Sequence, residues 1–126
     1  MIKFIDKISP FLYFIFRIII AVLFFLHGLT KFTGVLDGKI HLISLLGLAS
    51  IIELAAGVLI FLGLLTRFAA FLSAVEMLFA YFMVHFKIDL NPLTNNGEPA
   101  VLFFAVFLVL IVFGAGKFSI DKKFKI

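Results

Sequence analysis

Residues 11–29 read FLYFIFRIIIAVLFFLHGL. This run decides the fold because its residues are almost continuously apolar, and Arg17 is its one strongly charged side chain. A bilayer core about 30 Å thick takes about 20 apolar residues per helix. Pro10 directly precedes the run, as suits a helix start. A cleaved signal peptide is disfavoured, since Arg17 lies inside the run and no small-x-small cleavage site follows it. The run therefore predicts a membrane-spanning helix.

Three more apolar runs follow, over residues 40–65, 68–85 and 99–113. Only Thr66-Arg67 separates the second predicted helix from the third, so these two must form a tight antiparallel hairpin. The fourth run is short for a full span and stops at Gly114-Ala-Gly116, a typical helix end. The sequence thus predicts an all-α, integral membrane four-helix bundle, with residues 1–126 as a single domain.

The composition excludes an ordinary soluble domain and several chemistries. Of the 126 residues, 64% are hydrophobic and 14% are charged, with a mean hydropathy of +1.28. Soluble domains are about 45–50% apolar and about 25% charged. Cysteine is absent, which excludes a structural disulfide, thiol catalysis and a cysteine-ligated metal.

The distribution of basic residues predicts the orientation. With four spans, seven basic side chains share one side of the membrane with both termini: Lys3, Lys7, Arg67, Lys117, Lys122, Lys123 and Lys125. The other side holds Lys31, Lys39 and Lys87. The positive-inside rule then places both termini in the cytoplasm of a multi-pass protein of the cell inner (plasma) membrane. The net charge of +4 is explained by this topology. The Lys-rich tail is better interpreted as an anchor at an anionic membrane leaflet than as a nucleic-acid-binding segment.

Three strongly ionisable residues interrupt the apolar runs: Arg17, Glu53 and Glu76. An Asp, Lys or Arg at the centre of a membrane helix costs about 2.5–3.5 kcal/mol. We therefore expect Arg17 to contact Glu53, Glu76 or both, since an isolated charge is too costly there. One interpretation is an ion pair that fixes the helix register, with the second Glu protonated because burial disfavours its charged form. The other is a proton-handling or ligand-facing site.

Helical spacing places these residues on definable faces. Arg17 shares a face with Ala21, Phe24, Gly28 and Lys31, and Glu76 shares one with Ala69, Leu72, Ala80 and Met83. Small residues at i and i+4, as in Ala69-x-x-x-Ser73 and Ala70-x-x-x-Ala74, allow neighbouring helices to approach closely. The spacing predicts tight packing beside the charged positions.

A second polar group is predicted near the outer surface. His27 and His85 end the first and third predicted helices, Lys31 follows one turn after His27, and Glu98 closes the loop before the fourth helix. No HxxH or HExxH spacing supports a metal, and neither a metal nor a haem is predicted. Interfacial histidines are the favoured interpretation. The alternative is that His27 and Lys31 donate hydrogen bonds to a membrane-soluble carbonyl compound.

The polar landmarks together resemble the DoxX-like family of small four-helix membrane proteins. The matching residues in the first half are Arg17 with His27-Gly28-Leu29-Thr30-Lys31, Glu53 with Ala56-Gly57, and Gly63-Leu64-Leu65-Thr66-Arg67. Those in the second half are Glu76 before Met77, His85, Glu98, and Gly114-x-Gly116-x-x-Ser119-x-Asp121. Each motif is weak alone, but their order and spacing are specific, and they span nearly the whole chain.

The resemblance implies an inner-membrane protein linked to redox or oxidative-stress systems. The family name derives from a subunit of a thiosulfate:quinone oxidoreductase, and most members have no established reaction. The fold is similar to that of four-helix thiol–quinone reductases. This chain lacks the cysteine pair that those enzymes need, so it cannot perform their disulfide chemistry alone.

Two classes of function remain open. In the first, the protein is a quinone-binding redox component in which Arg17, Glu53 and Glu76 handle protons and His27 and Lys31 hold the headgroup. A cavity open toward the outer leaflet is then expected, with Phe24 and Met83 as apolar walls. In the second, the protein is a non-catalytic membrane subunit that anchors a soluble redox partner. A channel or carrier is a weaker third class, and a homo-oligomer stays open.

Overall fold

A computed structural model describes residues 1–126 and is all-α. The elements in order are α1 Ile2–Leu36, α2 Leu45–Leu62, α3 Thr66–Ala80, the π-helix η1 Tyr81–His85, α4 Glu98–Phe113 and α5 Ile120–Lys123. Three helices are long and apolar enough to cross a membrane: α1, α2, and α3 together with η1. The apolar helix α4 is shorter. The predicted all-α, multi-pass membrane fold is confirmed at this level.

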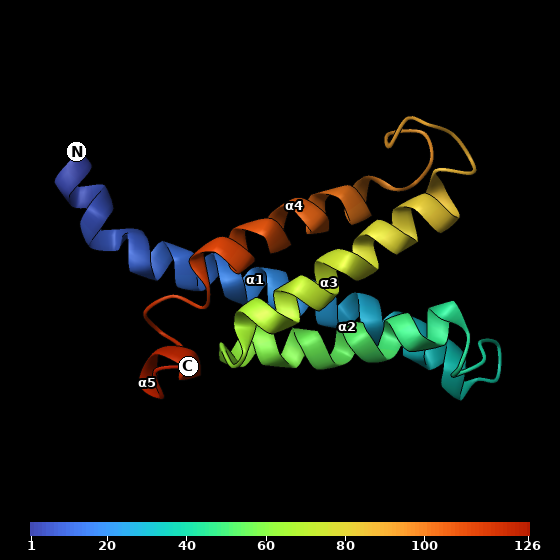
Figure 1. The fold of residues 1–126 in the computed structure, drawn as a ribbon, viewed down its shortest axis with the longest axis horizontal. Helices are drawn as coiled ribbons and strands as arrows, with labels where there is room; N and C mark the ends of the chain where they lie inside the picture. The colour runs from blue at the N-terminus through green and yellow to red at the C-terminus, as the bar shows by residue number, and fades with distance from the viewer.

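The helices are arranged as two hairpins. α1 packs along α2, and α3 packs along α4, whereas α2 and α3 touch less and α1 and α4 touch little. Both termini and the α2–α3 turn lie at one end of the molecule, and the α1–α2 and α3–α4 connections lie at the other (Figure 1). α2 and α3 are antiparallel as predicted, but they diverge as they leave their turn (Figure 1).

The first helix is longer than the sequence predicted. It begins at Ile2 and ends at Leu36, where residues 11–29 were expected, and Pro10 lies inside it. Proline removes one helical hydrogen bond and bends a helix without necessarily ending it. The N-terminal turns are accordingly set at an angle to the rest of α1 (Figure 1).

Local capping sets the other helix boundaries. α2 covers Leu45–Leu62 and not 40–65, because the Ser44 side chain accepts a hydrogen bond from Gly47 N and Gly63 adopts a left-handed φ of 69°. α3 ends at Ala80, and η1 continues it to the predicted end at His85. α4 stops where expected, since Gly114 has a φ of 73°.

The core is narrow and rich in small residues. Its fully buried large apolar side chains are Phe24, Ile60, Phe107 and Leu110. The alanines and serine of the predicted small-residue pairs on α3 are all buried, so their packing role is confirmed. Only 24 of 126 residues are buried, and the many exposed large apolar side chains suit contact with lipid tails.

Candidate functional site

Arg17 lies at the end of the molecule that holds the termini, and it is not paired with a glutamate. Its side chain is buried, with Nη1 donating to the Ala115 carbonyl (2.5 Å) and Nη2 to the Phe61 carbonyl (3.2 Å). The chain's single ion pair involves other residues, so the prediction that Arg17 contacts Glu53 or Glu76 is wrong. Phe61 lies in the last turn of α2, where carbonyls lack helical partners and carry partial negative charge, and Ala115 lies two residues past the end of α4.

The surroundings of Arg17 join the C-terminal segment to the α2–α3 turn. Tyr13 Oη donates to the Gly114 carbonyl (2.6 Å). Asp121 accepts from the backbone N–H groups of Leu65 (2.7 Å) and Thr66 (2.9 Å), and therefore caps the N-terminus of α3. The two motifs Gly63–Arg67 and Gly114–Asp121, which are far apart in the sequence, meet here. Arg17 therefore has a structural role at this end.

A second charged group forms toward the opposite end, where Lys31 Nζ contacts Glu53 Oε1 at 2.5 Å. The Glu53 side chain is 1% exposed and that of Lys31 is 28% exposed. Gly28 makes this contact possible, because a Cβ there would lie 2.7 Å from the Glu53 Cβ. Its missing side chain lets α1 and α2 approach closely one turn before Lys31.

Glu76 on α3 joins this group, so three helices contribute a charged side chain to it. Its carboxyl group lies close enough to Glu53 and Lys31 for their charges to act on it. Both of its oxygens and Glu53 Oε2 are buried without a hydrogen-bond partner. Lys31, Glu53 and Glu76, which we call the Lys31 cluster, thus hold two carboxyl groups for one cation.

An apolar cavity of about 360 Å³ lies beside the Lys31 cluster, between α2 and α3. Lys31 and Glu76 are its only charged lining residues. Its remaining lining residues come from the first half of α2 and from α3 and η1: Leu45, Leu46, Leu48, Ala49, Ile52, Leu72, Val75, Phe79, Ala80, Met83 and Val84. The cavity therefore lies where α2 and α3 diverge, far from the termini (Figure 1).

The walls of the cavity differ in part from those expected. Met83 lines it as predicted. Phe24 does not, because its ring packs in the core against Phe103 and Phe107, with centroids 5.3 and 4.8 Å away. Phe24 faces these α4 rings, and Lys31, seven residues later, is the α1 residue that lines the cavity.

The remaining candidate residues lie apart from the Lys31 cluster. His27 is exposed, and its ring meets that of Phe103 edge to face at 5.3 Å; Lys31, one turn later, lines the cavity, whereas His27 does not. His85 Nδ1 donates to the Asn95 carbonyl (3.0 Å) in the loop before α4. Glu98 is exposed in the first turn of α4.

Sequence reasoning missed the partner of Glu53. The sequence predicts Lys31 at the outer rim, yet Lys31 follows Arg17 by 14 residues on the same helical face. That spacing was the available signal, since it points Lys31 toward the same neighbouring helix at the level where α2 carries Glu53. The capping role of Asp121 was also missed, because Asp121 and the residues that it caps are more than fifty positions apart.

Comparisons with known proteins give two relatives and one family. The family model described as DoxX matches residues 12–86, which include the whole Lys31 cluster. A Haemophilus influenzae protein named "Uncharacterized protein" is 37% identical over 130 residues, covering 94% of this chain and 95% of its own length. A Bacillus subtilis protein named "Putative oxidoreductase CatD" is 34% identical over 112 residues, covering 83% and 81%. No solved structure matches.

Proposed function

This chain belongs to the DoxX family, and we propose that it is a quinone-linked redox component of the inner (plasma) membrane. The observation that carries the proposal is the apolar cavity whose only charged lining residues are Lys31 and Glu76. The oxidoreductase name of the Bacillus subtilis relative supports the redox part. A flat, lipid-soluble carbonyl compound is the ligand class that fits such a cavity.

The cavity has the size and the chemistry for one small ring. Small-molecule sites commonly enclose about 300–1,000 Å³ with mostly apolar walls and a few polar groups, and this cavity of about 360 Å³ belongs to that class. The Lys31 ammonium has three N–H donors, of which Glu53 takes one. A further N–H remains available for a ligand carbonyl, so Lys31 is the proposed headgroup contact.

The paired carboxyl groups supply a reason for placing a quinone here. Reduction of a quinone carbonyl to a hydroxyl takes up a proton, which a positioned acid must deliver inside the membrane. The Glu76 carboxyl group is buried, makes no hydrogen bond and lines the cavity, so it is positioned to deliver that proton. The chain has no cysteine, so its own disulfide chemistry cannot provide electrons, and a redox partner protein is part of this proposal.

We further propose four spans with both termini in the cytoplasm, which opens the cavity in the outer half of the membrane. The seven-to-three division of basic residues supports this orientation. α4 has 16 residues and is about 24 Å long, so its flanking segments must complete the crossing. Reporter fusions should place Asp37 and Asn95 outside and the C-terminus inside. A C-terminus outside the cytoplasm would refute the topology.

The test of function is quinone binding to the purified protein in lipid nanodiscs, measured by calorimetry with a short-chain ubiquinone analogue. Lys31→Met and Glu76→Gln should each weaken binding about tenfold or more, the factor that corresponds to about 1.4 kcal/mol. The matched controls are Glu98→Gln and His27→Ala, which lie outside the cavity and should bind as the parent does. No binding at saturating quinone, or equal losses in all four variants, would refute the proposal.

The alternative function is a non-catalytic anchor for a soluble redox partner. It accounts for the exposed lysines after α4, namely Lys117, Lys122, Lys123 and Lys125. It gives no role to the cavity or to the unpartnered carboxyl groups. A protein that binds no quinone but retains a soluble oxidoreductase through its tail would favour this alternative.

A further inference from the structure

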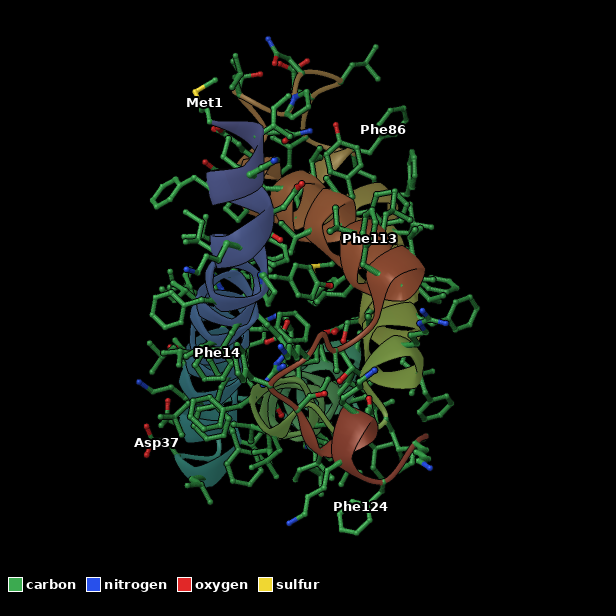
Figure 2. All side chains as sticks on the ribbon, turned by 90° about the vertical axis from the view of Figure 1, so that its left-hand side faces the viewer. Met1, Phe14, Asp37, Phe86, Phe113 and Phe124 are labelled. Carbon is green, nitrogen blue, oxygen red and sulfur yellow. The ribbon has the colours of Figure 1, made fainter.

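A second groove, separate from the Lys31 cluster, lies between the first part of α1 and the end of α4. Its volume is about 630 Å³, and Leu12, Val109 and Phe113 form its apolar walls. Figure 2 looks onto this end of the molecule, with α1 on one side and the end of α4, marked by Phe113, on the other. α1 and α4 make few contacts, so the groove opens sideways toward the surrounding lipid.

The N-terminal turns of α1 fix the level of this groove in the membrane. Between Ile2 and Pro10, Phe4 and Ile8 lie on one side of the helix and Lys3 and Lys7 on another. A basic amphipathic segment of this kind lies in the interfacial plane. Since Pro10 lies at the end of this segment and also lines the groove, we expect the mouth of the groove at the level of the lipid headgroups.

The rim of the groove is positively charged. Lys117 lines it and is exposed, with no carboxylate within ion-pair distance. Asp121, the acidic residue closest to Lys117 along the sequence, accepts from the backbone N–H groups of Leu65 and Thr66. The segment before Pro10 adds two lysines and one acidic residue, Asp6. An anionic phosphate is the complementary group at this level.

We propose that this groove binds one anionic phospholipid from the leaflet at which the chain termini lie. The lipid phosphate contacts Lys117, and an acyl chain lies along Leu12, Val109 and Phe113. Lys117 has no competing acidic partner, so it should favour a lipid with a net negative headgroup over the zwitterionic lipids around it. The site is independent of the proposed quinone cavity and of the inside–outside orientation.

The test is native mass spectrometry of the detergent-purified full chain, titrated with phosphatidylglycerol and with phosphatidylcholine of identical acyl chains. One phosphatidylglycerol should bind about fivefold more tightly than phosphatidylcholine, the preference expected from one basic residue near a lipid surface. Lys117→Gln should bring the two affinities together. Lys122→Gln, an exposed lysine outside the groove, should leave the preference intact.

A groove-filling variant distinguishes lipid binding in the groove from binding to the charged surface around it. Leu12 is half-exposed, so Leu12→Trp should fold normally while it blocks the acyl chain and weakens both lipids severalfold. An unchanged melting temperature confirms folding. Equal affinity of the parent for both lipids would overturn the proposal. So would a preference that survives Lys117→Gln, or lipid binding that Leu12→Trp leaves unchanged.

Discussion

Arg17 and Lys31 lie on one face of α1, 14 residues or about 21 Å apart, and the protein uses the two cations in opposite ways. Arg17 is 1% exposed and donates to two backbone carbonyls at helix ends. The Lys31 side chain is 28% exposed and pairs with Glu53, which faces a second carboxyl group beside a cavity. Arg17 therefore stabilises the fold, whereas Lys31 lies where its charge can also act on a ligand in the cavity.

The difference between the two sites lies in what remains unsatisfied. At Arg17, only the Nε nitrogen lacks a partner, and the acceptors are main-chain atoms that cannot take up or release a proton. In the Lys31 cluster, three carboxyl oxygens lack a donor. Buried unsatisfied polar atoms are costly to stability, so their presence beside a cavity favours a functional explanation over a structural one.

The largest effect should come from Arg17→Ala. It leaves the Ala115 and Phe61 carbonyls without their donor and empties the volume of a fully buried side chain. Hydrogen bonds to charged groups contribute about 1.5–3 kcal/mol each, so we expect a loss of roughly 3 kcal/mol or more. Folded yield and thermal unfolding in detergent measure it.

The control for this variant is Arg67→Ala. Arg67 is exposed and makes one hydrogen bond, to the Val112 carbonyl, so its loss should cost much less. Arg17→Lys should not restore stability, because one ammonium group cannot reproduce the planar geometry that joins two carbonyls. A stable Arg17→Ala protein would contradict the structural role of this site.

Gly28→Ala should have the next largest effect, and it acts at the other site. The added Cβ would lie 2.7 Å from the Glu53 Cβ and 2.8 Å from the Leu54 backbone nitrogen. Such overpacking costs about 1–3 kcal/mol and would displace Glu53 from Lys31. The melting temperature and the quinone affinity should therefore both fall.

The matched control is Gly34→Ala on the same helix. Its Cβ would meet only the Ile40 side chain, which can move aside, so stability and binding should change little. If the two alanine variants behave alike, the close approach of α1 and α2 at Gly28 is not what positions the Lys31 cluster.

Glu76→Gln sharpens the comparison because its effect on stability should be small. The substitution removes a buried carboxyl group that has no hydrogen-bond partner, together with its repulsion from Glu53. Since the Glu76 carboxyl group makes no hydrogen bond, none is lost, and we expect the free energy of unfolding to change by less than about 1 kcal/mol, the net contribution of one hydrogen bond. A marked loss of stability in calorimetry would instead assign Glu76 a structural role like that of Arg17.

The smallest effect should come from protonating Asp89 in the loop before α4, because its carboxyl group is fully exposed to water. Hydrogen bonds from the Thr94 hydroxyl, and secondarily from Leu90 N, hold the pKa of Asp89 below its usual value. A carboxyl group with a lowered folded pKa stabilises the fold above its unfolded pKa of about 3.9 and loses this effect as pH falls through the folded pKa. The protection of amides in residues 89–95, measured as exchange relative to the intrinsic rate at each pH, should thus fall below about pH 4.

Thr94→Val removes the main hydrogen bond to Asp89 and should flatten this pH dependence. The Lys31 cluster lies within the membrane helices and not in this loop, so quinone binding by the variant should match that of the parent. An unchanged pH profile in Thr94→Val would show that another group controls the loop.

Helix positions were predictable from the sequence, but helix ends and charge partners were predictable only in part. Apolar runs located the spans, and Gly114 marked the end of α4 correctly. The start of α1 was misplaced because proline is both a common first residue of a helix and, as at Pro10, a tolerated bend. The sequence predicts a glutamate partner for Arg17 because opposite side-chain charges are visible in it, whereas free backbone carbonyls depend on where the helices end and how they pack.

The sequence by itself determined that the chain is an all-α membrane protein, that its charges within the helices need partners, and that Arg17, Gly28 and Lys31 share one face. These properties follow from hydropathy and helical period, which are local. Only the tertiary structure decided that Lys31 and not Arg17 meets Glu53, and that a cavity opens beside Glu76. The reason is that α2 and α3 diverge from their turn, and the angle between two helices depends on contacts between residues far apart in the chain.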